Sequence, residues 1–499
     1  MGAGEKGRAS LCDDPNSVVR VGDRRSPLSG HRNHQDVHSP QGLTDIYAPG
    51  EHKVRPYSFN DDSMMLLTNP TYGPAPLRIA MLSVHSSPLG PLGASDTGGM
   101  SVYVRELSRW LGAAGHAVDI FTSAGPHHPD RLLYPNVRLI HLGKGLAKTP
   151  PKDGWLDLLP MVFEALDAYA RRQTRGYDLI HSHYWLSGVV GAMAQARWRR
   201  PHLTMFHTLG AVKNSTQSGE NEPDIRIAHE QWLAMATDRI IVAAPREQEL
   251  LAQWYHAHSS QTRVIPCGVN RDLFRPVASE TARRHLGIAP EAQVVLYVGR
   301  FAPLKGVDRL VAAVSALRPR FPKLQLLIVG GDGPRSGSSR ALKAMAARLG
   351  IADAVTFKGR IEHPDLPPYY SAADLLAMPS YYESFGLVVL EALACGTPVV
   401  ATPVGVAPAV IREGVTGTLV AGADPRDIAQ GIARILGQPA ALRPDAASIR
   451  AAVQDYGWPR VAAVVAEEYA QLLAMHDPTH ATPAISPGGW PNENWRCLP

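Results

Sequence analysis

Short apolar runs alternate with helical patterns along most of the chain. The first series reads LRIAMLSV (77–84), HAVDIFT (116–122), YDLIHSH (177–183), HLTMFHT (202–208) and RIIVAA (239–244). Each run is followed by a loop and then by residues with helical spacing, as in GMSVYVRELSRWLGAAG. Such runs are typical of strands buried on both faces of a parallel sheet, with helices as the crossovers.

A second series repeats the pattern further along the chain. It comprises QVVLYVGR (293–300), LQLLIVGG (324–331), AVTFKGR (354–360), DLLAMPS (374–380) and TPVVAT (397–402). The segment IPCGVNRDLFRPVASE between the two series contains Pro266, Gly268 and Pro276 and is a candidate hinge. We therefore predict an α/β fold of two doubly wound, Rossmann-like domains that face each other across a cleft, where ligands of such sheets bind.

The predicted domain boundaries follow from these series. The first domain spans 77–270, the second spans 271–457, and a final helix over 458–475 can cross back to the first domain. Residues 1–76 are polar, broken by Pro and Gly, and unable to bury enough apolar surface to offset their ordering entropy. We expect a disordered extension there and a flexible tail over 476–499.

Composition narrows the class of protein. The chain has 499 residues, 45% of them hydrophobic, and a net charge of +5. Its sequence lacks the concentrated basic stripe that is typical of a nucleic-acid binder. Its four cysteines are widely separated, which favours a reducing compartment over a disulfide framework. No stretch approaches the roughly 20 apolar residues of a membrane span. We expect a cytoplasmic protein.

The loop SSPLGPLGASDTGGM (86–100) joins the first strand to the first helix. Asp96 or Thr97 can cap that helix, and Gly98 and Gly99 would let backbone amides approach an anion at its positive end. An ordinary glycine-rich turn is the alternative reading of the glycine pair. The dinucleotide fingerprint G-x-G-x-x-G is absent from this loop.

Two further loops of the first domain carry polar side chains at strand ends. In HSHYWLSG (181–188), His181 and His183 share a face of a strand, but no nearby Cys or acidic residue completes a metal site, so no metal is predicted. Tyr184 suits the wall of a pocket for a hydroxylated substrate. In FHTLGAVKN (206–214), His207 lies where cleft residues gather, although a purely structural histidine is the alternative.

The second domain supplies two cations and two carboxylates. Arg300 and Lys305 lie in one loop before a helix, where they would hold a diphosphate and neutralise a departing phosphate. Glu383 and Glu391 are eight residues apart in YYESFGLVVLEALACGTPVVAT (381–402) and are expected to project toward the same side. The nearly apolar helix indicates burial, and a buried carboxylate needs a partner.

These motifs resemble those of the E-x7-E retaining glycosyltransferases of family 4, which have the GT-B architecture. The resemblance covers roughly residues 77–475 and rests on GRFAPLKG, ESFGLVVLEALACGTPVVAT, DTGGMSVYVREL, HSHYWLSG and FHTLGAVKN. Within the family the motifs are similar to those of D-inositol-3-phosphate glycosyltransferases and of bacterial sucrose-phosphate synthases.

The resemblance implies a nucleotide-sugar donor, most often UDP-linked, in the second domain. Arg300 and Lys305 would bind its diphosphate, Glu391 its ribose and Glu383 its hexose. His207 would lie near an outer hydroxyl of the transferred sugar. The other implied donor contacts are the backbone near Arg360 and Ile361 for the base, the amides of Phe385 and Gly386 for the hexose, and Gly99 for the diphosphate. Of these residues, His207, Arg300, Lys305 and Glu383 are the predicted catalytic set.

The resemblance also implies a phosphorylated polyol or sugar as the acceptor, bound in the first domain. The implied acceptor residues are Gly98, Gly99, Ser101, Lys152, Tyr184, Thr208 and Arg226. Ser101 stands where the inositol-phosphate enzymes usually carry asparagine after GGM, so the acceptor stays open.

Retention of configuration is implied by the family, and we expect front-face attack through an oxocarbenium-like state. No D-x-D motif occurs in 77–475, so no cofactor is predicted and Mg²⁺ is not implied. No nucleic-acid partner is expected, a peripheral membrane contact is disfavoured, and a homodimer stays open. The alternatives are a nucleotide-sugar epimerase of the same fold and a non-catalytic protein that binds nucleotide sugars or a membrane surface through arginines near Trp198.

Overall fold

The computed structural model describes residues 75–476 except 91, 93–96, 124–129, 143–153, 217, 220, 332, 334–335 and 440–441. All of these residues belong to one compact unit of the chain, Tyr47–Pro499. The predictions for residues 1–74, for 477–499 and for Lys152 lie outside the described residues.

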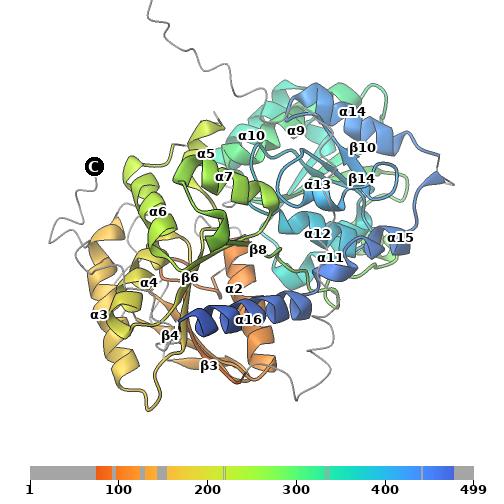
Figure 1. Ribbon diagram of the computed structural model, residues 1–499. Coiled ribbons are helices and arrows are strands. Elements are labelled where there is room, and N and C mark those ends of the chain that lie inside the picture. Colours follow the sequence, from red (N-terminus) through yellow and green to blue (C-terminus); the bar gives the residue numbers. More distant parts are fainter. Residues whose placement is uncertain are drawn as a thin grey trace, which may run out of the picture. The chain divides into compact units, whose positions relative to one another are not determined.

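The first sheet has, within the described residues, eight strands in the order β3-β4-β2-β1-β5-β6-β7-β8 (Figure 1). All neighbours are parallel except β3 and β4. The strands are β1 (Arg78–Leu82), β2 (Ala117–Thr122), β3 (Arg131–Tyr134), β4 (Val137–His141), β5 (Leu179–His183), β6 (His202–Met205), β7 (Arg239–Val242) and β8 (Thr262–Val264). The helices of this half are α2 (Gly99–Ala113), α3 (Leu159–Arg171), α4 (Trp185–Trp198), α5 (Gly210–Ser215), α6 (Asp224–Ala236) and α7 (Pro245–Tyr255).

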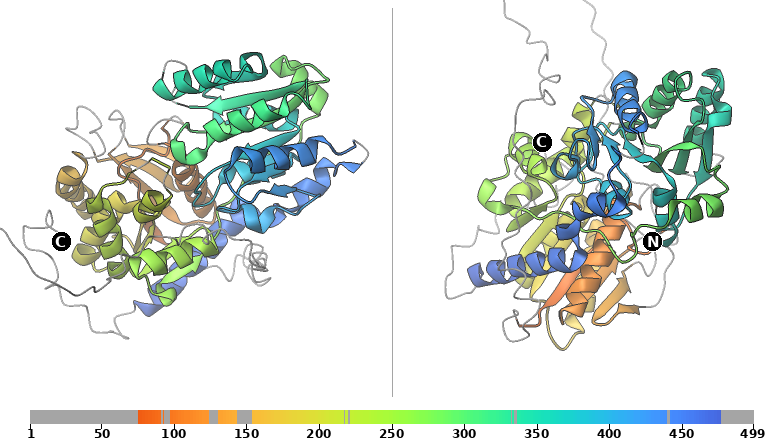
Figure 2. Two further views of the ribbon diagram at one scale, coloured as in Figure 1. Left: turned by 90° about the horizontal axis from the view of Figure 1, so that it is seen from above. Right: turned by 90° about the vertical axis from the view of Figure 1, so that its right-hand side faces the viewer.

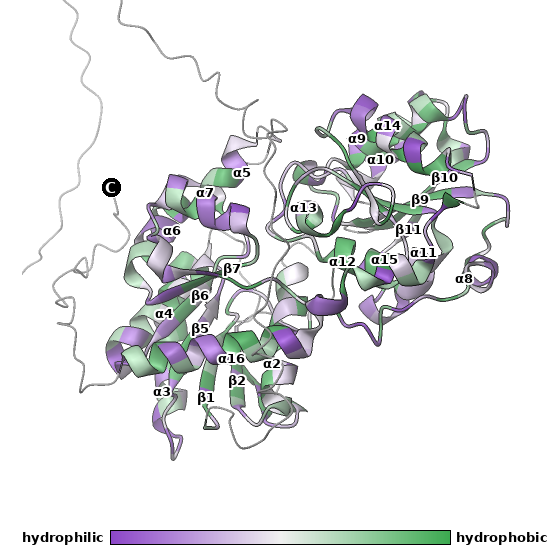
Figure 3. Ribbon diagram, turned by 45° about the vertical axis from the view of Figure 1, so that its right-hand side comes forward, coloured by the Kyte–Doolittle hydropathy of each residue, from purple (hydrophilic) through white to green (hydrophobic). Residues whose placement is uncertain are grey.

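Burial on both faces explains why β1 is apolar throughout. Alternate residues of a strand point to opposite faces. Ile79 and Met81 accordingly join a core that includes residues of α2, and Ala80 and Leu82 join a second core with residues of α3 and α4. Figure 3 shows β1 and β2 in the hydrophobic colours, whereas the α16 helix, over Trp458–Met475, alternates between hydrophobic and hydrophilic residues.

The second sheet is parallel and runs β11-β10-β9-β12-β13-β14. Its strands are β9 (Gln293–Gly299), β10 (Leu324–Gly330), β11 (Val355–Gly359), β12 (Leu375–Met378), β13 (Val399–Ala401) and β14 (Gly417–Leu419). Its helices are α8 (Ser279–Leu286), α9 (Val307–Leu317), α10 (Gly337–Arg348), α11 (Pro367–Ala372), α12 (Leu387–Ala394), α13 (Ala407–Val410), α14 (Pro425–Leu436) and α15 (Ala446–Ala451). The strand order reverses direction between β9 and β12, as it does between β1 and β5 in the first sheet, and ligands bind at such switch points. The predicted fold class is confirmed.

The last helix, α16, comes after the second sheet in the sequence but packs along the first sheet (Figures 1 and 2). The Tyr469 hydroxyl lies 2.6 Å from Nδ1 of His181 on β5. Where the chain enters α16, the Val269 N–H donates to the Tyr456 carbonyl at 2.7 Å, so the two connecting segments run side by side. Gly268 is required there, because a Cβ atom would lie 2.6 Å from the Trp458 ring.

Four strands escaped the sequence analysis. Of these, β3, β8 and β14 are edge strands of three or four residues, and β3 is half exposed, so none shows an apolar run. The fourth, β4, follows β3 through a tight turn in which Asn136 has a φ of 62°. The N-cap position of α2 is Gly98, not the predicted Thr97. Asp96, the other predicted cap, lies outside the described residues.

Candidate active site

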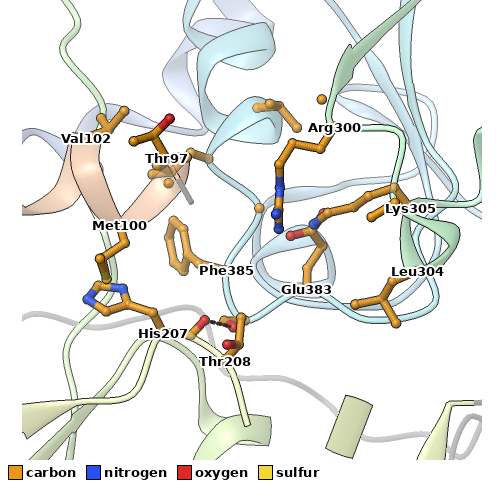
Figure 4. Close-up of a pocket in the computed structure, with 18 of the residues that line it drawn as sticks. Thr97, Met100, Val102, His207, Thr208, Arg300, Leu304, Lys305, Glu383 and Phe385 are labelled. Atoms are coloured by element: carbon orange, nitrogen blue, oxygen red, sulfur yellow. Dashed lines mark hydrogen bonds and ion pairs between the residues drawn. The ribbon is translucent and has the colours of Figure 1, made fainter. Parts of the chain in front are cut away.

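One cavity of about 410 Å³ lies where loops after the strands of both sheets meet. The first half contributes the start of α2 and the loops after β5 and β6. The second half contributes the loops after β9 and β12 and the start of α12. Figure 4 shows Arg300, Lys305 and Glu383 gathered on one side of this cavity, opposite Met100 and His207. Both switch points therefore open into the same space.

The N-terminus of α2 faces this cavity through Gly98 and Gly99. A Cβ atom on Gly98 would meet nothing within 4 Å, and one on Gly99 would meet the Leu387 side chain at an ordinary 3.5 Å. Packing therefore does not require either glycine, and a side chain would project into open space. The N-cap residue Gly98 has no side chain to cap α2, and the first amides of a helix lack partners within the helix and favour an anion.

The loop after β9 places two cations on the opposite wall. Lys305 ends the short 3₁₀ turn Pro303–Lys305, and its Nζ lies 2.6 Å from Oε1 of Glu383. The Ser380 hydroxyl donates to the same oxygen at 3.0 Å. Arg300 lines the cavity beside this pair, and the Tyr297 hydroxyl donates to its carbonyl at 2.7 Å. This wall therefore carries two positive groups, the Arg300 guanidinium and the Lys305 ammonium, and the single negative carboxylate of Glu383.

Glu391 lies on α12, whereas Glu383 belongs to the loop before that helix begins at Leu387. Their spacing is therefore not two turns of one helix, yet both line the cavity. Glu391 is 5% exposed and its carboxylate is bonded to Nε2 of His363 at 2.8 Å and to the Tyr370 hydroxyl at 2.7 Å. These two partners satisfy the buried carboxylate.

The remaining donor-side residues line the same cavity. Phe385 and Gly386 lead into α12, and Gly386 has a φ of 89°, a conformation that side chains rarely adopt. Arg360 and Ile361 follow β11, with Arg360 exposed and Ile361 half-buried. The structure brings all of them together with Arg300, Lys305, Glu383 and Glu391.

His207 lies on the first half's side of the cavity with a φ of 61°. Its backbone carbonyl accepts a hydrogen bond from the Ser384 hydroxyl of the second half. Its Nε2 lies 3.0 Å from Nδ1 of His183. Burial, and then the neighbouring His181 and His85, lower the pKa of His207 to about 3, so its ring is neutral at neutral pH.

Arg226 is 2% exposed and holds the acceptor-side wall together. Its Nε donates to Glu230 at 2.7 Å, its NH2 group donates to the Thr208 carbonyl and hydroxyl at 2.9 and 3.0 Å, and its guanidinium lies 4.9 Å from the Tyr184 ring centroid. Its NH1 lies 2.9 Å from a carboxylate oxygen of Glu222. The charge of Arg226 is therefore already compensated within the protein.

Glu222 also pairs with Lys213, and all three charged groups line the cavity. Burial acts to raise the pKa of Glu222, but Arg226 and Lys213 lower it to about 2. The carboxylate is therefore ionised at neutral pH. Glu222 was missed by the sequence analysis, although its position four residues before Arg226 is the spacing of a local ion pair.

Ser101, predicted to bind the acceptor, is fully buried on α2. Its hydroxyl lies 3.2 Å from that of Ser86, and it is not among the described residues that line the cavity. On α2 its side chain turns inward because Ser101 shares the packed face with Val104 and Leu107. The structure therefore does not bring Ser101 into contact with the candidate site.

The two histidines that were weighed as metal ligands, His181 and His183, bond to different partners. His181 bonds Tyr469, and His183 bonds His207. Within the part of the chain that the structure describes, no group of three His, Cys, Asp or Glu side chains is arranged to hold a metal ion. Sequence analysis considered His183 only as a metal ligand, and it missed His363, Tyr370 and Ser384. The partners of these four residues lie 21 to 177 residues away in the chain.

The chain has two Rossmann-like domains whose switch points share one cavity. That cavity carries a basic loop, two carboxylates and a helix N-terminus. This combination defines the two-domain class of glycosyltransferases called GT-B. Residues 278–452 match the family model of the glycosyl transferases group 1, and residues 97–273 match that of glycosyltransferase family 4. The chain therefore belongs to the family 4 glycosyltransferases and is a transferase enzyme, as its motifs predicted.

Curated relatives agree with this family. The chain is 40% identical to the D-inositol 3-phosphate glycosyltransferase of Streptomyces bingchenggensis over 415 residues, which are 80% of this chain and 90% of the relative. It is 41% identical to D-inositol 3-phosphate glycosyltransferase 2 of Catenulispora acidiphila, covering 80% and 96%. The solved sucrose-phosphate synthase of Thermosynechococcus elongatus superposes with a TM-score of 0.74 and 38% identity, covering 80% and 99%.

Proposed function

We propose that the protein moves a hexosyl unit, with retention of configuration, from a UDP-linked sugar to a phosphorylated small acceptor such as inositol phosphate or a sugar phosphate. One observation carries the proposal. A single cavity joins Arg300, Lys305 and Glu383 of one domain to the α2 N-terminus and the polar wall around Thr208 of the other. A donor and an acceptor can thus meet there with charges suited to each.

On the donor side, the diphosphate would be bound by Arg300, by Lys305 and by the amides at the start of α2. Arginine, lysine and helix N-termini are the groups that bind phosphates without a metal, so Mg²⁺ is not part of the proposal. Glu391, held by His363 and Tyr370, would accept hydrogen bonds from the ribose. The other donor contacts are Arg360 and Ile361 for the base, and Glu383, Phe385, Gly386 and His207 for the hexose.

In the proposed reaction, the acceptor oxygen forms a bond to the anomeric carbon as the bond from that carbon to the diphosphate breaks. The acceptor proton passes to the leaving phosphate oxygen on the same face, which accounts for retention. Arg300, Lys305 and the α2 dipole stabilise the negative charge that develops on the leaving group. Glu383 is held by Lys305 and Ser380 rather than aimed as a nucleophile, which favours this front-face scheme over a covalent intermediate.

The acceptor assignment is supported by the relatives, because the names D-inositol 3-phosphate glycosyltransferase and sucrose-phosphate synthase both contain a phosphorylated compound. Tyr184 and Thr208 would contact the acceptor, and Arg226 would act on it through Thr208. Lys152 stays a sequence-based proposal. A cytoplasmic location and a homodimer also stay predictions. Among the described residues, no helix is both long and apolar enough to cross a membrane.

The test incubates the purified chain with a panel of nucleotide sugars against inositol phosphate, fructose 6-phosphate and glucose 6-phosphate, and measures the released nucleoside diphosphate. We expect release only in the presence of one phosphorylated acceptor. Lys305→Ala and Glu391→Ala should abolish it, whereas Lys323→Ala, at an exposed lysine outside the cavity, should not. Turnover that survives both cavity substitutions would show that the donor assignment is wrong. Interconversion of nucleotide sugars without an acceptor would instead indicate an epimerase.

A further inference from the structure

A hydrogen bond joins the half-buried His207, which lines the cavity, to the buried His183. His183, at the end of β5, is 0% exposed, and its Nδ1 lies 3.0 Å from Nε2 of His207. The Tyr103 ring packs edge-on against both imidazoles, with centroids 5.6 and 5.4 Å away. The pair is therefore enclosed on the side away from the cavity and has a defined geometry.

Both imidazoles are neutral at neutral pH. Burial, followed by the neighbouring histidines, lowers the pKa of His183 well below its usual value and that of His207 to about 3. Two neutral rings share one proton in their hydrogen bond. Either His183 donates from Nδ1 to Nε2 of His207, or His207 donates from Nε2 to Nδ1 of His183.

The surroundings of His183 favour the first arrangement. Its other ring nitrogen, Nε2, is buried and has no hydrogen-bond partner among the described residues. If His207 were the donor, His183 would carry its own proton on Nε2 as a buried N–H without an acceptor. Orphaned buried N–H groups are rarer than under-satisfied acceptors and cost about 1–3 kcal/mol. With His183 as the donor, the proton of His207 resides on Nδ1.

The backbone of His207 is held as firmly as its ring. A φ of 61° is uncommon for a residue other than glycine and persists only where the surroundings impose it. The Ser384 hydroxyl donates to the carbonyl of the same residue from the other domain. Strained residues constrained in this way cluster at functional sites.

We infer that His183 is a positioning residue, which fixes the ring orientation and the Nδ1–H tautomer of His207 by donating a hydrogen bond to its Nε2. The role rests on the proposed function, because it matters for turnover only if His207 contacts the donor. In that tautomer His207 offers an N–H rather than a lone pair to a sugar hydroxyl or a phosphate oxygen. An imidazole free to change tautomer would present an acceptor to those oxygens in part of the molecules.

The first experiment measures the tautomer without any substitution. Two-bond ¹H–¹⁵N spectra of the histidine-labelled full chain distinguish the two neutral forms, and His207→Gln identifies the His207 signals by their loss. We expect the Nδ1–H form of His207. Observation of the Nε2–H form overturns the inference.

The second experiment compares two substitutions of His183. His183→Asn keeps a side-chain N–H near the position of Nδ1, whereas His183→Leu removes every polar atom. We expect His183→Leu to mix the His207 tautomers and to lower kcat by about 10- to 100-fold, the range known for loss of the bonds that orient metal-ligating histidines. His183→Asn should retain the tautomer and restore most of kcat.

The control is His181→Asn, at a buried histidine on the same strand whose partner is Tyr469. It should lower stability without changing the His207 tautomer or kcat. If kcat fell equally in the His181→Asn, His183→Asn and His183→Leu proteins, His183 would have only a structural role and the inference would be wrong. If His207→Gln kept full activity, the proposed contact of His207 with the donor would fail, while the tautomer measurement would still decide the inference.

Discussion

At the scale of single residues, several charges of the candidate site are already paired within the protein. Lys305 pairs with Glu383 at 2.6 Å, and Arg226 pairs with Glu230 and Glu222 at 2.7 and 2.9 Å. Pairing offsets the desolvation cost of these buried or half-buried charges. It also means that a bound phosphate competes with a resident carboxylate.

Glu222→Gln should therefore strengthen binding of a phosphorylated acceptor. The substitution removes a negative charge between Lys213 and Arg226, both of which line the cavity. Since a hydrogen bond to a charged group contributes about 1.5–3 kcal/mol, we expect the acceptor KM to fall by about 10-fold, with the donor KM unchanged. Steady-state kinetics with the acceptor identified by the panel measures this. Glu249→Gln, at an exposed glutamate on α7, is the control. An unchanged or higher acceptor KM would contradict the prediction.

His202→Asn should flatten the pH dependence of stability. Burial, with a contribution from His181, lowers the pKa of His202 to about 3 in the folded chain, against about 6.5 unfolded. Between these values the unfolded chain binds the extra proton, so stability falls as pH falls below about 6.5. The group accounts for a loss of about 2 kcal/mol between pH 8 and pH 5. Denaturant unfolding at both values should show that loss shrink by this amount, with exposed His256→Asn as the control. If the stability difference between pH 8 and pH 5 were the same in His202→Asn as in the wild type, the prediction would be wrong.

At the scale of elements, the helix N-termini of the two domains can be compared directly. Both α2 and α10 begin with a glycine, Gly99 and Gly337, and a Cβ atom on either would meet no close contact. Only the first of the two lines the cavity. Substituting each glycine in turn therefore distinguishes two effects: the conformational effect of glycine at a helix start, and the space that glycine leaves for a ligand.

Gly99→Ala should raise the donor KM and lower kcat without loss of stability. The added methyl group would intrude on the space in front of the α2 amides, while alanine suits a helix better than glycine by up to about 1 kcal/mol. Gly337→Ala should give a similar change in melting temperature and leave the kinetics as in the wild type. If the two substitutions affected the kinetics equally, the α2 N-terminus would not be the diphosphate site.

Most buried strands were predictable and most edge strands were not, although the buried strand β4 was missed and the edge strand β11 was predicted. The runs around β1, β9 and β12 are apolar because both of their faces are covered. By contrast, β3 has two exposed and two half-buried residues, and Leu132 within it is 69% exposed. An edge strand takes its conformation from its neighbour rather than from its own hydrophobic pattern.

At the scale of the whole molecule, the two domains meet at the candidate site as well as along the connecting segments. The Ser384 hydroxyl of the second domain bonds the His207 carbonyl of the first. Leu304 and Tyr382 pack into a core formed largely by first-domain residues. Closure of such a cleft excludes water and completes the catalytic arrangement.

Ser384→Ala should therefore weaken domain closure. Loss of the hydroxyl leaves the His207 carbonyl without that donor, at a cost of about 1 kcal/mol, or roughly 5-fold in the population of the closed form. We expect a lower kcat and faster amide hydrogen exchange in residues 206–209, with a normal melting temperature. Ser315→Ala, at an α9 serine remote from the cavity, is the matched control. Unchanged exchange in that segment would contradict a role in closure.

The sequence by itself determined the two parallel sheets, the family and the loops that line the cavity, because burial on both faces and the chemistry of short motifs are local properties. Tertiary structure alone decided the partners. It placed His363 and Tyr370 on Glu391, Glu222 between Lys213 and Arg226, His183 against His207, and Ser101 inside the core instead of the cavity. These contacts join residues that the chain separates by up to dozens of positions, and their energies depend on distance and orientation in space, which no local pattern encodes.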